Sequence, residues 1–451
     1  MHPMTILSRY NHIQPWRGQY FIIYNAFTGA IALLDQENHQ VYNSIVEKLK
    51  TGADSDFTPK EQEMLRQMDY AGFIHPDQYS QREELKFLHN FARYGGAALG
   101  LVIAPTMACN MACEYCFEGN KKGRMSEDTI GEVEAFVKKS ADNIGRFNVT
   151  WYGGEPLLAL DIIEKLTFSF LEMGREYHFA YSADLITNGY LLKPEVVDKL
   201  VEWQVRMAQV TLDGPARHHD KKRSLKNGGS SFETIVENLK YAADKIKISI
   251  RVNVDEKFNI DLLRELLDQL IEAGLRDKIQ MYFEFLEPIN SVCANIAESC
   301  HTTRDFSNVE VDYYRLLLEK EFRIDKLPSP TAQYCLAQCV SGFALDPDGD
   351  IYRCLNTVGD KSKSMGNIRE KIQFMHPNFQ RLFRFNPFED EKCRECDILP
   401  LCLGGCPARR ADKGHTSDDI CESWRYNLPE MLEVIALSKY RQLKPEMKEQ
   451  L

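Results

Sequence analysis

Residues 99–286 alternate between short apolar runs and longer amphipathic stretches. In the longer stretches apolar residues recur at helical spacing, as Ile130, Val133 and Val137 do. Repeated strand–helix units predict a parallel sheet, because right-handed crossovers place the helices on one face. We therefore expect an α/β fold with a partial (βα)6 barrel of TIM type, whose chemistry lies at the carboxyl ends of the strands. The predicted strands cover residues 99–104, 147–152, 180–187, 205–212, 246–254 and 280–286.

The N-terminal region shows a different pattern. Two apolar runs, 20–24 and 30–34, flank a turn that contains Gly29, which predicts a β-hairpin. Two helices should follow, the first capped by Asn38 and the second opened by the capping box of residues 58–61, with Pro at its first turn. A hairpin with short helices predicts a winged-helix-like module, and a purely structural extension is the alternative.

Length and charge narrow the class of protein. At roughly 150 residues per domain, 451 residues predict two to four domains. The 55 basic and 66 acidic side chains give a net charge of -11, which disfavours nucleic acid and anionic lipid as partners. The chain contains no apolar run of the ~18 residues that a membrane helix needs, and residues 1–16 do not resemble a signal peptide. We expect a cytoplasmic protein without a membrane partner.

Thirteen cysteines are unevenly distributed along the chain. The first 108 residues contain none, and eight lie between Cys335 and Cys421. In a cytoplasmic protein thiols stay reduced, so this clustering predicts ligands of a metal or a cluster. Cys293 and Cys300 lie outside every motif, and they are interpreted as core thiols, with a role in substrate handling or assembly as the alternative.

The loop after the first predicted strand contains Cys109, Cys113 and Cys116, in a C-x3-C-x2-C spacing. Structural zinc takes four ligands, and no fourth Cys or His lies nearby at the spacing of a zinc ribbon. A 4Fe-4S cluster held by three cysteines keeps one iron open for an exogenous ligand. The spacing therefore favours an open iron–sulfur site.

Polar residues follow the next strands. Paired glycines let the backbone approach a ligand, a carboxylate accepts a hydrogen bond from an ammonium group, and an arginine binds a carboxylate. These residues predict a binding site, although the choice of turn residues for backbone conformation alone is an alternative. The candidates are Gly153, Gly154, Glu155, Asn188, Thr211 and Arg223.

Together these motifs resemble the radical S-adenosylmethionine (SAM) enzymes. The similarity rests on the cysteine triad with Tyr115 before its last member, on Gly-Gly-Glu-Pro at 153–156 and on Thr-Asn-Gly at 187–189. It implies a 4Fe-4S cluster whose open iron binds SAM and whose reduction yields a 5′-deoxyadenosyl radical, but it names no catalytic acid or base. Carried over, it assigns Cys109, Cys113 and Cys116 to the cluster, Tyr115 to the adenine, Gly153, Gly154 and Glu155 to the methionine amino group, Asn188 and Thr211 to the ribose or carboxylate, and Arg223 to the carboxylate.

The C-terminal cysteines resemble a SPASM domain, which implies two auxiliary 4Fe-4S clusters and three clusters in all. In that family the ligands of the two clusters interlace along the chain. If Cys335 is a fourth ligand of the first cluster, that cluster is fully ligated, and otherwise one iron stays open for substrate; full ligation is slightly favoured. The implied sets are Cys339, Cys354 and Cys406 with Cys335 for the first cluster, and Cys393, Cys396, Cys402 and Cys421 for the second.

The order of the predicted domains resembles that of SPASM enzymes that modify ribosomally made peptides (RiPPs). We expect a recognition module at 1–92, the radical SAM barrel at 93–325 and the SPASM domain at 326–451. In such enzymes the leader of the precursor peptide pairs as an added strand with an exposed sheet edge. A low-potential electron donor, such as ferredoxin or flavodoxin, is implied as the second partner.

The resemblance implies a peptide maturase that abstracts hydrogen and installs a thioether, ether or carbon–carbon cross-link. The alternative enzyme is an anaerobic sulfatase-type maturase, which oxidises Cys or Ser to formylglycine and typically lacks the N-terminal module. A protein that only transfers electrons or serves as a scaffold is a third hypothesis. Residues 153–155 and the three-cysteine site argue against it, since electron transfer requires neither.

Overall fold

A parallel sheet organises the central part of the computed structural model, which describes residues 5–51, 56–77, 79–118, 122–288, 291–332, 335–411 and 420–442. Six parallel strands lie in sequence order and agree with the predicted strands to within two residues at either end. They are β6 (Ala98–Thr106), β7 (Arg146–Gly153), β8 (Ala180–Thr187), β9 (Val205–Thr211), β10 (Lys247–Val254) and β11 (Ile279–Phe285).

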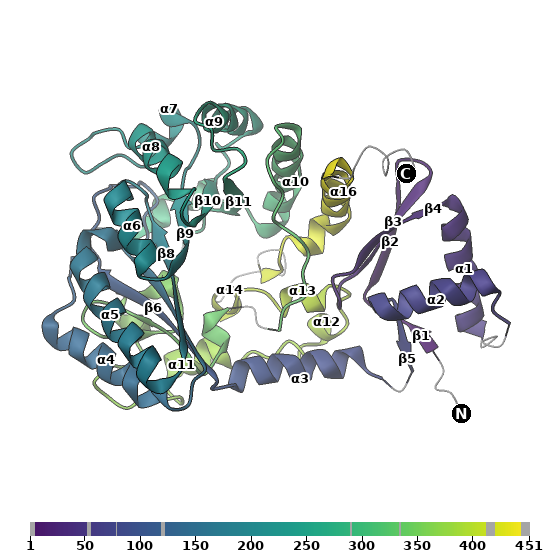
Figure 1. Ribbon diagram of the computed structural model, residues 1–451, viewed down its shortest axis with the longest axis horizontal. Helices are drawn as coiled ribbons and strands as arrows, with labels where there is room; N and C mark the ends of the chain where they lie inside the picture. The colour runs from purple at the N-terminus through teal and green to yellow at the C-terminus, as the bar shows by residue number, and fades with distance from the viewer. Residues whose placement is uncertain are drawn as a thin grey trace.

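Helices follow these strands and cover one face of the sheet (Figure 1). Along β7, Phe147, Val149 and Trp151 are fully buried, whereas the alternate residues face the other side of the sheet. The six-strand parallel arrangement predicted from the sequence is therefore confirmed. The helices are α4 (Glu127–Ala141), α5 (Leu160–Tyr177), α6 (Pro194–Glu202), α7 (Ala216–Lys222), α8 (Phe232–Ala242), α9 (Ile260–Glu272) and α10 (Thr303–Glu319), with η1 (Pro156–Ala159) before α5 and η2 (Ser291–Ser299) before α10.

Two strands from the C-terminal region extend this sheet, and the sequence pattern did not predict them. β12 (Gly342–Leu345) pairs in parallel with β6, and β13 (Ile351–Tyr352) pairs antiparallel with β12. All residues of both strands are buried, so they lack the polar–apolar alternation that marks a half-buried strand. The sheet therefore has eight strands, with β11 and β13 at its edges.

The N-terminal region contains a three-stranded antiparallel sheet of β2 (Asn11–Trp16), β3 (Tyr20–Asn25) and β4 (Ile31–Asp35). A second sheet pairs β1 (Thr5–Leu7) with β5 (Ile74–Pro76). The predicted hairpin is confirmed as β3 and β4, and Gly29 in its turn has a φ of 77°. Its winged-helix-like character stays a prediction.

Two helices pack beside these strands, α1 (Gln36–Thr51) and α2 (Pro59–Ala71). The capping box of α2 is confirmed, because Thr58 and Glu61 exchange both hydrogen bonds. The prediction that Asn38 caps α1 was wrong. That helix already begins at Gln36, and Asp35 Oδ1 accepts the hydrogen bond from the Asn38 backbone N–H at 2.7 Å.

Helix α3 (Gln81–Tyr94) runs from the N-terminal region to the sheet and was not predicted (Figure 1). The C-terminal region lies between these two parts in the same view. Within the described residues, every helix is too short or too polar to cross a bilayer. The C-terminal elements are η3 (Leu336–Gln338), η4 (Leu355–Thr357), η5 (Lys361–Lys363), α11 (Pro377–Phe383), α12 (Glu391–Arg394), α13 (Leu399–Cys402), α14 (Pro407–Ala411) and α16 (Trp424–Gln442).

The two ends of the chain meet. Gln14 on β2 donates a hydrogen bond to the carbonyl oxygen of Pro429 on α16 at 2.8 Å, and the rings of Trp16 and Tyr440 lie edge to face at 6.2 Å. Tyr24 donates a bond of 2.5 Å to the Pro328 carbonyl oxygen. These contacts attach the N-terminal sheet to the C-terminal region.

Asn25, at the end of β3, is a fully buried hub of the N-terminal region. Its Nδ2 donates to Ser8 Oγ at 2.9 Å, to Asn11 Oδ1 at 2.7 Å and to the Gly72 carbonyl oxygen at 3.0 Å. Its Oδ1 accepts hydrogen bonds from the backbone of the hairpin turn at 2.9 and 3.0 Å. One amide side chain therefore joins the turn, β2 and the end of α2.

We expect Asn25→Asp to destabilise the N-terminal region. The substitution keeps the shape of the side chain but replaces its donor with a charged oxygen facing three acceptors, a change that should cost about 2 to 4 kcal/mol. Hydrogen–deuterium exchange of the full-length protein should then show faster exchange in residues 20–35. Asn43→Asp, at an exposed position on α1, is the control. Equal exchange in both variants would contradict this role of Asn25.

Candidate functional site

The candidate residues of the first three barrel strands meet at the carboxyl edge of the sheet. Glu155, directly after β7, is fully buried and accepts hydrogen bonds from the Asn188 backbone N–H at 2.8 Å and from Thr187 Oγ1 at 2.8 Å. Asn188 Nδ2 donates to Asn110 Oδ1 at 2.7 Å, in the cysteine loop. The ends of β7 and β8 are thereby tied to the loop that follows β6.

Gly153 and Gly154 allow this approach. A Cβ on Gly153, whose φ is 117°, would lie 2.3 Å from the Thr106 carbonyl oxygen, and a Cβ on Gly154 would lie 2.5 Å from those of Met107 and Ala108. The sequence predicted that the glycines let the backbone approach a ligand. In the structure they let β7 approach the backbone that leads into Cys109, and their contact with a ligand stays a prediction.

A buried polar cluster holds the other side of the cysteine loop. Asp213, after β9, is fully buried, and its carboxylate accepts hydrogen bonds from Tyr115 Oη and from the Asn253 backbone N–H, the latter at 3.0 Å. Arg223 Nη1 donates to Tyr115 Oη and lies 3.7 Å from Asp213 Oδ2. Burial is the largest single influence and raises the pKa of Asp213, but Arg223, His219, Tyr115 and Lys222 together oppose it, so the pKa is lowered.

Tyr115 and Arg223 were predicted as contacts of SAM, and the structure shows them as partners of each other. Thr211, the last residue of β9, is buried beside Arg251 of β10. Sequence reasoning did not nominate Asp213 and Asn253. Asp213 lies two residues after β9 and Asn253 is the second-last residue of β10, so their position near the carboxyl edge was the available signal.

The chemistry of this loop fits an iron–sulfur cluster. Burial raises the pKa of Cys109 to about 12 and also raises that of Cys113, so these thiols stay neutral unless a cation binds them. Among the described residues, Asn110 Nδ2 and Arg223 Nε are buried donors without a protein acceptor. Thiols and unpaired donors together suit a cluster with a carboxylate-bearing ligand.

The eight C-terminal cysteines fall into two groups according to which of them influence one another's pKa. Burial first, and then the neighbouring Cys406, Cys354 and Cys339, raise the pKa of Cys335 to about 12. In the second group, Cys393 and Cys396 are each influenced by Cys421, and Cys402 by Cys396 and Cys393. None of the thirteen cysteines, all of which lie in the described residues, forms a disulfide bond. The division equals the one implied by the SPASM resemblance, and the role of these residues as ligands stays a prediction.

Within the described part of the chain, no three His, Cys, Asp or Glu side chains converge on one metal ion. A 4Fe-4S cluster spreads its thiolates over separate irons, which suits the wider spacing of these groups. Cys293, which is fully buried, and Cys300, whose thiol lies 3.2 Å from the Ile296 carbonyl oxygen, belong to neither group.

Arginines beside the cysteines were missed by sequence reasoning. Arg353 is buried and donates to the carbonyl oxygen of Ala337 at 2.9 Å and to that of Leu336 at 3.3 Å, which shapes the loop carrying Cys335 and Cys339. Arg410 Nη2 lies 3.2 Å from Cys393 Sγ, and Arg425 Nη1 lies 3.6 Å from Cys396 Sγ. Spacing along the chain does not reveal where such long side chains point.

Arg409 connects the barrel to the first C-terminal cysteine group. From α14 it forms a bidentate ion pair with Glu287, with distances of 2.6 and 2.8 Å, and it lies 3.8 Å from Glu284 at the end of β11. Its guanidinium also covers the Phe285 ring at 4.7 Å. Cys406 lies three residues earlier, so this contact sets its position relative to the barrel.

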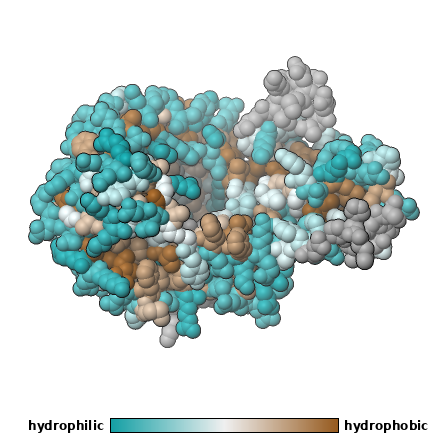
Figure 2. All heavy atoms as spheres, turned by 60° about the horizontal axis from the view of Figure 1, so that its bottom comes forward, coloured by the Kyte–Doolittle hydropathy of each residue, from teal (hydrophilic) through white to brown (hydrophobic). Residues whose placement is uncertain are grey.

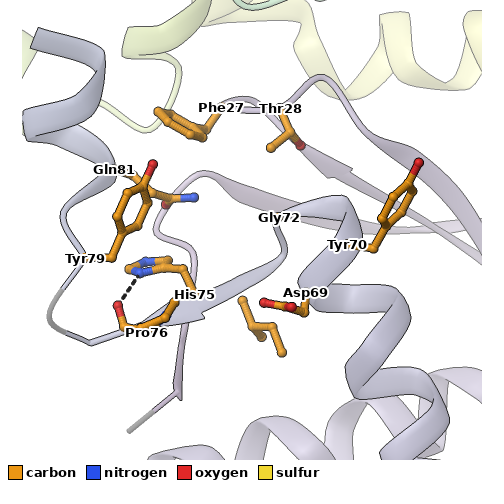
Figure 3. A pocket seen from close by; sticks show the side chains of 10 residues that line it. Phe27, Thr28, Asp69, Tyr70, Gly72, His75, Pro76, Tyr79 and Gln81 are labelled. Carbon is orange, nitrogen blue, oxygen red and sulfur yellow. Dashed lines mark hydrogen bonds between the residues drawn. The ribbon is translucent and has the colours of Figure 1, made fainter. Parts of the chain in front are cut away.

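A separate cavity of about 560 Å³ lies in the N-terminal region (Figure 3). It is formed by the β3–β4 turn, the end of α2, strand β5 and the segment before α3. Among the described residues, strand β5 pairs only with β1, so it is an edge strand of this part of the structure. The lining residues are Phe27, Thr28, Asp69, Tyr70, Gly72, Ile74, His75, Pro76, Tyr79 and Gln81.

Comparison with known proteins identifies the central domain. Residues 103–270 match the Radical SAM superfamily. The mycofactocin maturase MftC of Mycolicibacterium smegmatis is 26% identical over 359 residues, which span 75% of this chain and 86% of that protein. The Cysteine-type anaerobic sulfatase-maturating enzyme of Clostridium perfringens strain 13 is 26% identical over 385 residues, spanning 74% of this chain and 98% of that protein.

Solved structures agree in fold. The anSMEcpe structure with bound AdoMet and the Kp18Cys peptide superposes with a TM-score of 0.59 at 21% identity, covering 76% of this chain and 99% of that one. Streptococcus suis SuiB bound to S-adenosylmethionine superposes with a TM-score of 0.53 at 17% identity, covering 92% of this chain and 99% of that one. The resemblance inferred from the sequence is confirmed for residues 103–270, which match the Radical SAM superfamily, and that family's cofactors are SAM and a 4Fe-4S cluster.

We expect Gly154→Ala to disrupt the cysteine loop. The added methyl group would meet two carbonyl oxygens at 2.5 Å, and neither can move without displacing Cys109. After anaerobic reconstitution the variant should hold about four fewer iron atoms per chain and cleave SAM at least about tenfold more slowly. Gly131→Ala, on α4 with open space around its Cβ, is the control. Normal iron content and SAM cleavage in Gly154→Ala would contradict this account.

Proposed function

We propose that this radical SAM enzyme is a peptide maturase, which abstracts hydrogen from a residue of a ribosomally made precursor peptide and installs a thioether, ether or carbon–carbon cross-link. The observation that carries the proposal is the extent of the likeness to SuiB. The superposition on SuiB covers 92% of this chain, whereas residues 93–451 alone make up only about four-fifths of the chain. The likeness therefore extends into the N-terminal region, and a second SuiB structure contains the precursor peptide SuiA.

Three functional parts follow from this proposal. Residues 1–92 recognise the leader, residues 93–325 form the barrel in which the radical is made, and residues 326–451 form a SPASM domain. The antiparallel sheet with α1 and α2 supports a winged-helix-like module at the N-terminus. The grouping of the cysteines supports the third part.

The proposed cofactors are SAM and three 4Fe-4S clusters. Bound SAM supplies the 5′-deoxyadenosyl radical when an electron reaches it. The charges of its three proposed partners each raise the pKa of Cys335, which supports full ligation of the first auxiliary cluster. The proposed ligands are Cys109, Cys113 and Cys116 for the SAM cluster, Cys335, Cys339, Cys354 and Cys406 for the first auxiliary cluster, and Cys393, Cys396, Cys402 and Cys421 for the second.

SAM is held by residues at the strand ends. Glu155 accepts a hydrogen bond from the methionine ammonium, and its bonds to Thr187 and Asn188 fix its orientation. Arg223 binds the carboxylate through the donor Nε, while Nη1 stays bonded to Tyr115. The remaining proposed contacts are Tyr115, Gly153, Gly154, Asn188 and Thr211.

The N-terminal cavity supports peptide recognition. Its size suits a few side chains, and Tyr70, which lines it, is 96% exposed. Edge strand β5 offers backbone groups beside the cavity, so a leader can add a strand and place a side chain in the pocket at the same time. The second proposed partner is a low-potential electron donor such as ferredoxin or flavodoxin.

The second candidate function is that of an anaerobic sulfatase-type maturase, which oxidises Cys or Ser to formylglycine. It is favoured by the TM-score of 0.59 to anSMEcpe, which is higher than the 0.53 to SuiB. That likeness covers only 76% of this chain, so it does not require the N-terminal region. The two functions differ in product, since formylglycine carries an aldehyde and a cross-link does not.

The function is tested by incubating reconstituted enzyme anaerobically with SAM, a low-potential reductant and peptides encoded beside its gene. A cross-linked product should lose two hydrogen atoms by mass spectrometry and fail to react with a hydrazide probe. Tyr70→Ala should bind the precursor about tenfold more weakly, equivalent to about 1.4 kcal/mol, but cleave SAM at the normal rate. Phe168→Ala, on α5, is the control. A hydrazide-reactive product would favour formylglycine, and unchanged precursor binding by Tyr70→Ala would reject the pocket.

Cys335→Ala tests the ligation of the first auxiliary cluster. If Cys335 is a ligand, the substitution should change the electron paramagnetic resonance spectrum of that cluster or remove up to about four iron atoms per chain. Cys300→Ala, outside both cysteine groups, should change neither. An unchanged spectrum with unchanged iron in Cys335→Ala would leave one iron open for substrate.

A further inference from the structure

Helix α3 has the reverse of the usual amphipathic pattern. Its buried face carries Gln81, Leu85, His89 and Arg93, three of which are polar. Its solvent face carries four large apolar residues, here called the α3 patch: Phe87 (66% exposed), Leu88 (40%), Phe91 (69%) and Tyr94 (58%). An exposed cluster of this kind on a helix marks an interaction surface rather than a core.

The buried face of α3 contacts the first C-terminal cysteine group. The Cys339 thiol lies 3.4 Å from the Ala92 carbonyl oxygen, and the Val340 backbone N–H donates to the Arg93 carbonyl oxygen at 2.8 Å. Ala92 directly follows Phe91 of the α3 patch. The residue that contacts a proposed ligand of the first auxiliary cluster is therefore the direct neighbour of a residue in the α3 patch.

The other end of α3 approaches the second group. Arg82 pairs with Glu395 at 3.6 Å, and Glu395 precedes Cys396 in the chain. The helix thus passes close to both cysteine groups, and the α3 patch lies on its outer side. Figure 2, which turns the lower side of Figure 1 forward, shows apolar side chains at the centre of this face, over α3.

The apolar surface continues into the segment around α11. The Tyr94 ring meets Phe383 edge to face at 5.5 Å, and Phe374 and Met375 before this helix are 45% and 81% exposed. The same segment is basic although the whole chain carries a net charge of -11. Residues 363–384 contain one acidic residue, Glu370, and the five basic residues Lys363, Arg369, Lys371, Arg381 and Arg384.

We propose that the α3 patch and the basic segment beside it form the docking site for a small acidic electron-transfer protein that carries a low-potential flavin or iron–sulfur centre. The apolar patch supplies the centre of the interface, and the basic segment attracts an acidic partner. In each encounter the reduced partner loses one electron and the auxiliary cluster beside Cys339 gains it, with no transfer of protons or groups. This inference rests on the proposed auxiliary clusters.

The test uses the full-length enzyme with reconstituted clusters and one-electron-reducing flavodoxin hydroquinone as the probe. The variant Phe87→Ser/Phe91→Ser removes the centre of the α3 patch, and Phe168→Ser, 54% exposed on α5, is the matched control. Stopped-flow absorbance then follows cluster reduction by flavodoxin and, separately, by dithionite. We expect at least a tenfold slower reduction by flavodoxin in the double variant, with unchanged iron content and an unchanged rate with dithionite.

A second variant, Lys371→Glu/Arg384→Glu, should slow the reaction with flavodoxin and weaken its dependence on ionic strength. An unchanged flavodoxin rate in both variants would overturn the proposal. The proposal would also be overturned if the flavodoxin rate were unchanged while a variant bound the precursor more weakly, because the patch would then bind peptide. The same holds if the rate were unchanged while a variant lost self-association, because the patch would then bind a second copy. Absence of the proposed auxiliary clusters would be detected separately from absence of the docking site, because iron content and reduction by dithionite are measured before flavodoxin is added.

Discussion

The close packing of β7 against the loop after β6 is the constraint on which the site depends. Gly153 and Gly154 bring two backbones so near that no side chain larger than hydrogen fits between them. This approach places Glu155 where it bonds to the end of β8, and it places Cys109 and Asn110 over the carboxyl edge of the sheet. The ends of β6, β7 and β8 therefore fix one another's positions, so a shift of any one strand would displace the other two.

Charge is the second organising factor. The site buries carboxylates and many thiols, and buried negative charge is costly without nearby cations or hydrogen-bond donors. Arg223 offsets Asp213 beside the cysteine loop, while Arg410 and Arg425 approach sulfur atoms in the C-terminal region. In the first C-terminal group, Arg353 and Arg93 oppose the burial that raises the pKa of Cys339. Each group of cysteines thus has its own basic side chains, which favour the thiolate form needed for the proposed binding of iron.

The sequence predicted the parts that follow from local pattern. The six parallel strands, the hairpin at Gly29 and the capping box of α2 arise from periodicity and turn chemistry within a few residues. Strands β12 and β13 were missed because they are short and wholly buried, and α3 because its polar face is the buried one. Asp213 and Asn253 lie at predicted strand ends, but their contact with each other was shown only by the structure. The arginines were missed because sequence spacing does not show where a long side chain points.

The pairing of β12 with β6 also determines when the fold can be completed. Gly342 of β12 pairs with Gly100 of β6, so β6 can complete its pairing only after a segment about 240 residues later in the chain has been synthesised. Until then β6 presents an open edge, which is a hazard for aggregation. Cys339 lies three residues before β12, so its loop is anchored only after this late pairing. Assembly of the proposed auxiliary iron site at Cys339 is consequently tied to this late step of folding.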